Sequence, residues 1–501
     1  MTDINDPKLR DQPEPGWQIL DRDLGRFTSL EEAGTYMAKP LVAIGLALIF
    51  VVLAAAWAGL IAGGSNGTLI VVVASAFAAY MAVNIGANDV ANNMGPAVGA
   101  NALTMTGALI IAAICETAGA LIAGGDVVET VASGIVDPAA LANGSIFVMA
   151  MMAALLSSAL WLNLATWMGA PVSTTHAIVG GVAGAGIAAA GFGVVNWPGM
   201  GQIAASWVIS PILGGALAAA ALWVIHQLII DRADKVAAAR IWVPVLIAVM
   251  AWAFASYLAL KGLKHLFEVS LTQSVLIGLV VAALAWLVAK PYIRHRSQGL
   301  ENRNKSLKVL FQIPLVLSAA LMSFAHGAND VANAIGPLAA IVSILGTPDA
   351  TVVAVPLWVM VIGALGISVG LMLFGPRLID MVGDQITKLN AMRAYCVALS
   401  AAVTVIAASG LGLPVSSTHI AIGGIFGVGF FREAMEARRM REMTGTVELP
   451  NFPSEERRRR KLVRRSHFLT IIAAWLITVP LTALLSGLVF LLLQWLHIFA
   501  V

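Results

Sequence analysis

The sequence predicts an all-α polytopic membrane protein, built from two inverted-topology repeats with helices broken at a central site. Composition is the first observation behind this prediction: 59% of the 501 residues are hydrophobic and only 11% are charged. A soluble globular chain carries about 25% charged residues, so this chain must place most of its surface in lipid. The other two observations are a series of long apolar runs and a pair of motifs that each occur twice.

Thirteen transmembrane helices are predicted, because a run of about 20 apolar residues spans a bilayer as a helix. The expected spans are 41–63, 68–86, 107–124, 146–168, 172–190, 202–230, 241–260, 270–289, 309–327, 355–375, 394–411, 415–431 and 468–498. Shorter apolar pieces follow two of them, near 94–105 and 335–346. They are too short to span and are expected to be half-helices or re-entrant arms.

Basic residues predict the orientation in the membrane. Eleven lie in 432–465 and six in 290–308, whereas none lies between Lys39 and Arg232. Short cytoplasmic loops are enriched in Lys and Arg, so these loops and the N-terminal tail are expected in the cytoplasm. The number of spans then leaves the C-terminus outside the plasma (inner) membrane. Residues 1–39 show no apolar core of a signal peptide.

Charge and cysteine content argue against two further classes of protein. The net charge of +3, from 30 basic and 27 acidic residues, predicts no nucleic-acid partner. Cys115 and Cys396 both lie in apolar runs, so no disulfide framework is implied.

These signals divide the chain into seven segments. The predicted division is a cytoplasmic tail (1–39), an extra transmembrane helix (40–66), a first inverted repeat (67–190), connecting transmembrane helices with a cytoplasmic loop (191–308), a second inverted repeat (309–431), a basic cytoplasmic loop (432–467) and a last transmembrane helix (468–501).

Two motifs occur once in each repeat. Residues 86–96 read Gly-Ala-Asn-Asp-Val-Ala-Asn-Asn-Met-Gly-Pro, and nine of these eleven positions match 327–337. Residues 171–181 read Pro-Val-Ser-Thr-Thr-His-Ala-Ile-Val-Gly-Gly, and seven of eleven match 414–424. The two halves are therefore collinear copies.

The copies are predicted to be inverted in the membrane. The span entering the second Asn-Asp motif, 309–327, leaves a basic loop and so starts inside, whereas 68–86 follows one earlier crossing and starts outside. Inverted repeats with Gly/Pro-interrupted polar segments in matching positions are the sequence signature of a secondary transporter's central site.

The first motif offers ligands for a cation. Asp89 and Asn92 are three residues apart, as are Asp330 and Asn333, and that spacing puts both side chains on one face of a helix. Their hard oxygens suit Na⁺. Interhelical hydrogen bonding is the structural alternative. With the neighbouring residues added, the candidate coupling-cation ligands are Asn88, Asp89, Asn92, Asn329, Asp330, Asn333 and Glu116.

The second motif offers donors for an anion. A proline followed by three hydroxyl residues is typical of a helix start, where free N–H groups form an anion site. Two such starts, converging from the two halves, could enclose a tetrahedral oxyanion. Hydrogen bonding of each hydroxyl to its own helix backbone is the alternative. The candidate substrate ligands are Ser173, Thr174, Thr175, Ser416, Ser417 and Thr418.

Four titratable side chains accompany the motifs. His176 and His419 directly follow the hydroxyl runs, and His326 precedes the second Asn-Asp motif, so all three are candidates for proton relay or for orienting a helix end. A packing role is the alternative for a lone membrane histidine. Glu116 lies in an apolar run and is a candidate cation ligand or proton carrier. The other half has Ile85 opposite His326 and Ile367 opposite Glu116.

At these motifs the sequence resembles the PiT family of inorganic phosphate transporters, over residues 67–498. The resemblance implies symport of phosphate with Na⁺ or H⁺, and the oxygens of the Asp/Asn pairs favour Na⁺ slightly. It implies cation and phosphate binding at Asp89, Asn92, Asp330 and Asn333, and phosphate binding at the hydroxyl runs. Glu116 is similar to the acid of the family's Glu-Thr-x-Gly stretch, and Ala398 stands where eukaryotic members carry a further acid.

The resulting hypothesis is a phosphate:cation symporter that is not an enzyme and has no cofactor besides Na⁺ or H⁺ as coupling ion. Sulfate is the alternative substrate, since some bacterial relatives carry it. An intramembrane aspartyl protease is the alternative from another class, because one aspartate per half could form a dyad; a channel is a third. The expected partners are phosphate and the lipid bilayer, and a homodimer is compatible with the sequence.

Overall fold

The computed structural model describes residues 41–64, 67–138, 141, 143–168, 172–262, 269–346, 355–385, 390–444 and 465–496. Residues 1–49 and 50–501 form two units, and the arrangement given below is that within the second. The predicted cytoplasmic tail, 1–39, lies outside the described residues.

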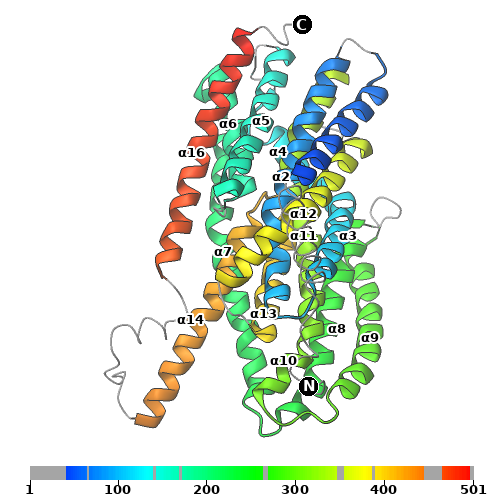
Figure 1. The fold of residues 1–501 in the computed structure, drawn as a ribbon, viewed down its shortest axis with the longest axis vertical. Coiled ribbons are helices and arrows are strands. Elements are labelled where there is room, and N and C mark those ends of the chain that lie inside the picture. The colour runs from blue at the N-terminus through cyan, green and yellow to red at the C-terminus, as the bar shows by residue number, and fades with distance from the viewer. Residues whose placement is uncertain are drawn as a thin grey trace, which may run out of the picture. The chain divides into compact units, whose positions relative to one another are not determined.

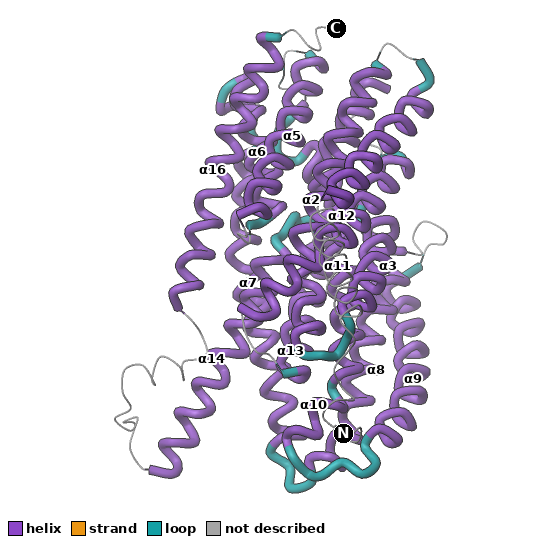
Figure 2. Tube along the Cα trace, in the orientation of Figure 1, coloured by secondary structure: helices purple, strands orange, loops and turns teal. Residues whose placement is uncertain are grey.

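Apart from one isolated bridge between Val136 and Val195, every described regular element is a helix (Figures 1 and 2). A helix at Leu41–Ala62 comes first. It is followed by α2 (Thr68–Gly99), α3 (Met105–Ala123), α4 (Gly125–Ser133), α5 (Gly144–Met168), α6 (Thr174–Ala190), α7 (Trp197–Ile225), α8 (Lys235–Gly262), α9 (Leu271–Arg296), α10 (Asn304–Leu310), α11 (Gln312–Gly346), α12 (Leu357–Gln385), α13 (Ala391–Gly410), α14 (Ser417–Thr444) and α16 (Arg465–Trp495).

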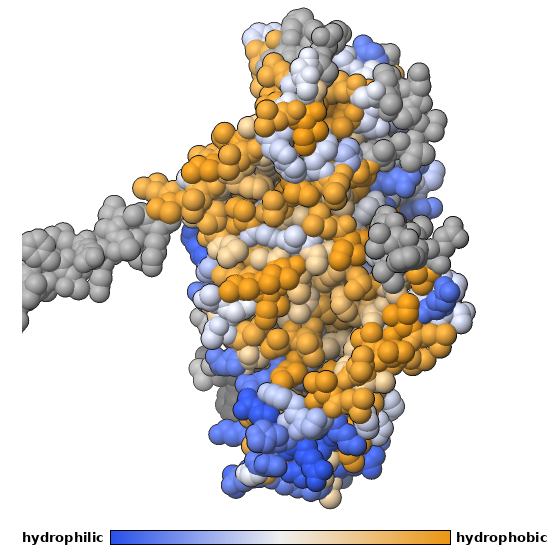
Figure 3. Space-filling view, turned by 90° about the vertical axis from the view of Figure 1, so that its right-hand side faces the viewer, coloured by the Kyte–Doolittle hydropathy of each residue, from blue (hydrophilic) through white to orange (hydrophobic). Residues whose placement is uncertain are grey.

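Among the described residues, eleven helices are long and apolar enough to cross a membrane. The all-α membrane class is therefore confirmed. Each of the thirteen predicted spans coincides with a helix, but α6 has only 17 residues and α14 continues into a charged stretch, so neither is among the eleven. Apolar side chains cover a broad band of the face in Figure 3, and hydrophilic ones gather at its lower end.

The Asn-Asp motifs lie inside continuous helices, and the two predicted half-helices after them are wrong. α2 runs on to Gly99 through Pro96, and α11 to Gly346 through Pro337. Proline is tolerated inside membrane helices because neighbouring groups can satisfy the carbonyl it frees. The breaks lie instead at the hydroxyl motifs, between α5 and α6 and between α13 and α14.

Helix packing is reciprocal between the two halves. α2 packs on α12 and α11 packs on α3, while α6 packs on α16 and α14 packs on α7. The glycine of each Asn-Asp motif permits the first pair of contacts: a Cβ at Gly86 would lie 1.9 Å from the carbonyl oxygen of Ile367, and one at Gly327 would lie 2.1 Å from that of Glu116. Only glycine lets two backbones approach so closely.

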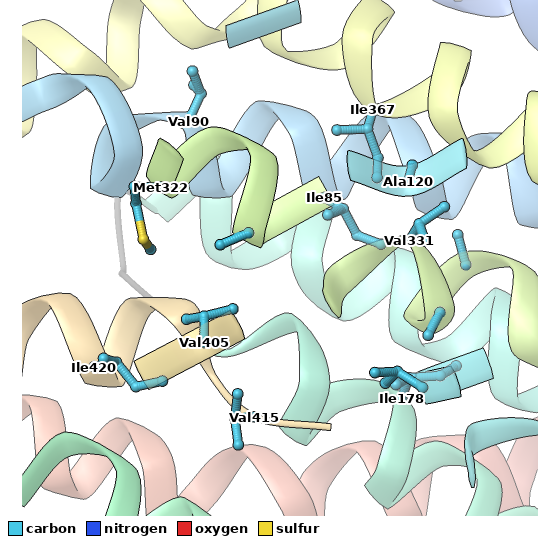
Figure 4. Close-up of a cluster of buried hydrophobic side chains, with 14 of the residues drawn as sticks. Ile85, Val90, Ala120, Ile178, Met322, Val331, Ile367, Val405, Val415 and Ile420 are labelled. Carbon is cyan, nitrogen blue, oxygen red and sulfur yellow. The ribbon is translucent and has the colours of Figure 1, made fainter. Parts of the chain in front are cut away.

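The same contacts give relative helix directions. α2 and α12 run the same way, because Gly370 lies against Val83 and Gly375, further along, lies against Val90. Gly375 also lies against Leu109, so α2, α3 and α12 share the buried apolar cluster of Figure 4.

α3 and α12 run in opposite directions. Gly375 lies against Leu109, whereas Ser368, earlier in α12, is hydrogen-bonded to Thr117, later in α3. α3 and α11 run the same way, because Gly119 lies against Phe324 and Gly124 lies against Val331. It follows that α2 and α11, which carry the two Asn-Asp motifs, are antiparallel.

The predicted basic loop 432–467 begins as helix instead, since α14 continues to Thr444. Ion pairs four residues apart, Arg432–Glu436 and Arg438–Glu442, stabilise that extension. Residues 445–464 lie outside the described part of the chain.

Candidate functional site

The two hydroxyl motifs form the starts of α6 and α14. Ser173 Oγ accepts a hydrogen bond from the N–H of His176 at 3.1 Å, and Ser416 Oγ accepts one from the N–H of His419 at 3.3 Å. A serine in this position caps the helix by satisfying an N–H that has no partner within it. The structure thus gives both serines, predicted as substrate ligands, a capping role.

Asp89 is a fully buried carboxylate of α2 that receives hydroxyls from both halves. Its Oδ1 accepts from Thr418 Oγ1 at 3.0 Å, and its Oδ2 accepts from Thr174 Oγ1 at 3.1 Å. The Nδ2 groups of Asn88 and Asn92 also donate to Oδ1, at 3.0 and 3.4 Å. The first repeat's acid is therefore bound by one helix start from each repeat.

Asp330 of α11 has the same arrangement with the halves exchanged. Its Oδ2 accepts from Ser417 Oγ at 3.0 Å, and its Oδ1 lies 3.5 Å from Thr175 Oγ1, whose one hydrogen is shared with the Val415 carbonyl at 3.0 Å. Asn333 Nδ2 lies 3.4 Å from the same Oδ1. The four hydroxyls that follow the capping serines thus contact the two aspartates, two hydroxyls at each.

The second asparagine of each motif contacts a threonine of the opposite half. Asn92 Nδ2 donates to Thr418 Oγ1 at 2.8 Å, and Asn333 Nδ2 donates to Thr175 Oγ1 at 3.1 Å. Asn333 is fully buried, and within the described part of the chain its Oδ1 accepts no hydrogen bond. A buried oxygen without a donor is suited to a cation.

The first asparagine of each motif holds the chain before a helix start. Asn88 Nδ2 donates to the Val172 carbonyl at 3.1 Å. Asn329 Nδ2 donates to the Leu413 carbonyl at 3.3 Å, and its Oδ1 accepts from the Val415 N–H at 3.3 Å. These two predicted cation ligands therefore support the backbone beside the site.

His326 lies between the two aspartates. Its Nε2 is 2.9 Å from Asp330 Oδ2 and 3.5 Å from Asp89 Oδ2, and all three side chains are buried. One ligand atom from each lies within 4.8 Å of the others, close enough to share one ion. His326, predicted from the sequence as a proton relay or orienting residue, is thus central to the site.

Glu116 lies behind His326. Its Oε2 is 3.2 Å from His326 Nδ1, and its Oε1 accepts from Asn93 Nδ2 at 2.8 Å. The corresponding positions in the other half are the fully buried Ile85 and Ile367. We call the linked side chains of Asn93, Glu116 and His326 the asymmetric arm, because they make the otherwise two-fold site asymmetric. Glu116 contacts His326, and the His326 imidazole in turn contacts the two aspartates.

His176 and His419 meet each other across the two halves. Their ring centroids are 4.5 Å apart at an interplanar angle of 86°, and the His176 ring is also 3.9 Å from that of Trp207. Both histidines directly follow the threonines that reach the aspartates, so the ring contact joins the first turns of α6 and α14.

Three residues around the site were missed by sequence reasoning. Asn93 bonds Glu116, while Trp207 and Thr130 donate to backbone carbonyls of the chain before α14. Asn93 lies within the first motif but opposite Ala334, so the repeat gave no signal for it. Trp207 and Thr130 belong to no repeated motif, and only tertiary structure identifies them.

Chemically, the site combines two buried carboxylates with four hydroxyl donors at two helix starts. Carboxylate and amide oxygens bind cations, whereas hydroxyls and helix N-termini bind anions. The two kinds of group alternate within hydrogen-bonding distance, so a cation and an anion bound here would be in contact.

Comparison with known proteins agrees with this chemistry. Residues 85–486 match the family described as "Phosphate transporter family". The chain is 43% identical to a Helicobacter pylori protein over 522 residues, covering 93% of this chain and 98% of that protein. It is 36% identical to a Chlamydia trachomatis protein, covering 85% and 98%. Both relatives carry the name "Putative phosphate permease".

A solved structure has the same fold. It is titled "The sodium-dependent phosphate transporter", is 32% identical in sequence, and superimposes with a TM-score of 0.77 over 85% of this chain and 99% of that one.

Proposed function

Because this chain belongs to the phosphate transporter family, we propose that it is a secondary active transporter that symports inorganic phosphate with a cation. The observation that carries the proposal is that each buried aspartate accepts hydroxyls from both repeats: Asp89 from Thr174 and Thr418, and Asp330 from Ser417 and Thr175. A site shared in this way between two repeats is the arrangement expected of a transporter that works by alternating access, in which one repeat moves against the other.

Electrostatics requires the cation. Phosphate carries one or two negative charges at neutral pH, and the buried Asp89 and Asp330 would add two more. Such a cluster repels itself unless cations enter or the carboxylates take up protons. Na⁺ is slightly favoured over H⁺, because the Asp/Asn pairs offer several oxygens and the structural neighbour is named as sodium-dependent.

The hydroxyls supply the coupling. A threonine hydroxyl has one hydrogen to donate, and in this structure those of Thr174 and Thr418 point to Asp89. A cation at the carboxylate replaces that hydrogen bond and frees the hydroxyl to donate to a phosphate oxygen. Cation and phosphate therefore favour each other's binding through the same side chains.

The same donors could bind sulfate, which is also a tetrahedral oxyanion, and sulfate remains the second candidate substrate. The aspartyl protease alternative is wrong, because the family and the structural neighbour are transporters.

The topology proposed for this transporter is an inverted repeat, 67–190 and 309–431, with a pseudo-two-fold axis in the membrane plane. The antiparallel α2 and α11 and the reciprocal packing of α6 on α16 and α14 on α7 support it. The N-terminus is proposed to be cytoplasmic and the C-terminus to lie outside the plasma membrane.

The test is phosphate uptake into proteoliposomes with a Na⁺ gradient or a pH gradient imposed separately. Accumulation driven by one gradient identifies the coupling ion. Accumulation that follows neither gradient would refute symport, and accumulation of sulfate instead of phosphate would change the substrate but keep the mechanism.

A further inference from the structure

The chain between α13 and α14 is the subject of a further inference, which rests on the proposed function. Residues 411–416 belong to no helix, yet they lead directly into Ser417 and Thr418, the hydroxyls that reach the aspartates. Leu411 is exposed and Pro414 is buried, so the segment runs from the surface into the site. We call residues 410–415 the hairpin turn.

Three N–H groups of the hairpin turn donate to carbonyls at the end of α13, and that of Val415 donates to Asn329 Oδ1 of α11. The N–H groups of Leu411 and Leu413 donate to the Ala408 carbonyl, and that of Gly412 donates to the Ser409 carbonyl. Gly412 adopts a positive φ of 69°, which glycine allows without strain.

Five of the six carbonyl groups of the hairpin turn accept hydrogen bonds from other helices. Five side chains, each from a different helix, donate to five carbonyls. They are Lys261 of α8 to Gly410 (3.3 Å), Thr130 of α4 to Gly412 (2.6 Å), Asn329 of α11 to Leu413 (3.3 Å), Trp207 of α7 to Pro414 (3.1 Å) and Thr175 of α6 to Val415 (3.0 Å). Lys261 is itself paired with Asp126 of α4.

The five side chains that donate to the hairpin turn do more than stabilise the fold. Backbone outside a helix has no carbonyl partners of its own and, in a membrane, must find them in the surrounding protein. The partners therefore fix the path of the hairpin turn and with it the position of the first residues of α14. A small displacement there would move the hydroxyls of Ser417 and Thr418 out of hydrogen-bonding distance of the aspartates and of a bound anion.

We propose that Thr130 and Trp207 are positioning residues for phosphate transport, which hold the hairpin turn so that Ser417 and Thr418 face the substrate. Neither residue touches an aspartate. Thr130 comes from the short helix α4, which no sequence motif marks, and its hydroxyl makes the shortest of the five bonds. Trp207 fixes the carbonyl three residues before Ser417.

The test compares purified variants in proteoliposomes by the phosphate concentration dependence of uptake and by phosphate binding. Thr130→Val removes one donor and keeps the shape, whereas Trp207→Phe removes the indole N–H and leaves a smaller aromatic ring beside His176. One lost hydrogen bond should weaken apparent phosphate affinity by about 3- to 10-fold. Thr130→Ser keeps the hydroxyl and should restore affinity to within about two-fold of wild type.

Trp197→Phe is the matched control, because Trp197 also donates its indole N–H to a carbonyl, that of Phe192 at 3.0 Å, away from the hairpin turn. Its affinity should be that of wild type. A residue with a purely structural role would lower the amount or turnover of active protein and leave KM unchanged, whereas a positioning role raises KM.

A second comparison tests the route of action. In a Ser417→Ala/Thr418→Val background both hydroxyls that Thr130 positions are absent, so adding Thr130→Val should change affinity by less than about two-fold. The inference would be overturned if Thr130→Val weakened affinity in that background by the same factor as in wild type. It would also be overturned if Thr130→Val and Trp207→Phe both kept the wild-type KM. Wild-type protein that neither binds nor transports phosphate would overturn the proposed function and this inference with it.

Discussion

Thr418 Oγ1 donates to Asp89 Oδ1 across 3.0 Å, although 329 residues separate them along the chain. Thr175 makes the corresponding contact with Asp330, at 3.5 Å. Each repeat therefore supplies a hydroxyl to the aspartate of the other repeat, and neither forms the site alone.

Removing one of the crossing hydroxyls should weaken substrate binding. Thr175→Val and Thr418→Val keep the shape and leave a buried anion without a donor, which costs about 1–3 kcal/mol. Apparent phosphate affinity in proteoliposome uptake should fall by about ten-fold. Thr404→Val is the control, since Thr404 is buried but bonds its own helix at Ser400. Equal affinities in all three variants would show that the crossing hydroxyls are structural.

Neutralising either aspartate should abolish concentrative uptake. Asp89→Asn and Asp330→Asn remove the charge that attracts the coupling cation but preserve the side-chain shape. Uptake against a phosphate gradient, driven by whichever ion gradient serves the wild type, is the measurement. Asp234→Asn is the control: it caps α8 through the Ala237 N–H, and asparagine caps equally well. Undiminished accumulation in either site variant would rule out its role in coupling.

Exchanging Glu116 of the asymmetric arm and Ile367, the residue at the corresponding position of the other half, should be harmful in both directions. Glu116→Ile copies Ile367 but leaves Asn93 and His326 without their shared partner, so uptake should be lost. Ile367→Glu buries an unpaired carboxylate in an apolar cluster, which should lower thermal stability by several degrees. Measuring uptake for the first variant and melting in detergent for the second separates the two effects. A functional Glu116→Ile transporter would contradict the assigned arm.

The motif glycines should be required for packing. A Cβ at Gly86 or Gly327 would overlap a carbonyl oxygen of the facing helix, so Gly86→Ala and Gly327→Ala should lower the melting temperature or prevent folding. Gly201→Ala, in α7 with nothing near its Cβ position, should leave stability unchanged or slightly higher. Detergent-solubilised protein melting like wild type in all three variants would contradict the close approach.

The proposed topology can be tested by labelling. Asp11→Cys in the tail and Glu301→Cys in the loop before α10 should both react with an impermeant maleimide only from the cytoplasmic side, in a background lacking Cys115 and Cys396. Lys264→Cys should react from the outside. Opposite sides for residues 11 and 301 would refute the orientation.

The sequence predicted the parts of the site that are repeated. Asp89 and Asp330 could be found because the same motif occurs twice, and repetition distinguishes function from chance polarity. Asn93 and Trp207 could not be found, because each acts through a contact made only by the folded chain. The predicted half-helix near residues 94–105 was wrong because the short apolar piece was treated as separate from the span at 68–86, whereas α2 continues through the polar motif and Pro96 to Gly99. Ser173 and Ser416 were assigned to the substrate because a serine at a helix start can serve as ligand or cap, and sequence does not distinguish the two.

The meeting of two helix starts at Asp89 and Asp330 has a consequence for how an anion is attracted. In the described part of the chain, no lysine or arginine bonds to either aspartate. Each helix start carries a partial charge of roughly +0.5, so α6 and α14 together contribute about one positive charge that belongs to the backbone. Such a charge cannot be titrated, acetylated or removed by an amine-reactive reagent. The positive potential they supply therefore stays constant across the pH range in which phosphate gains its second charge.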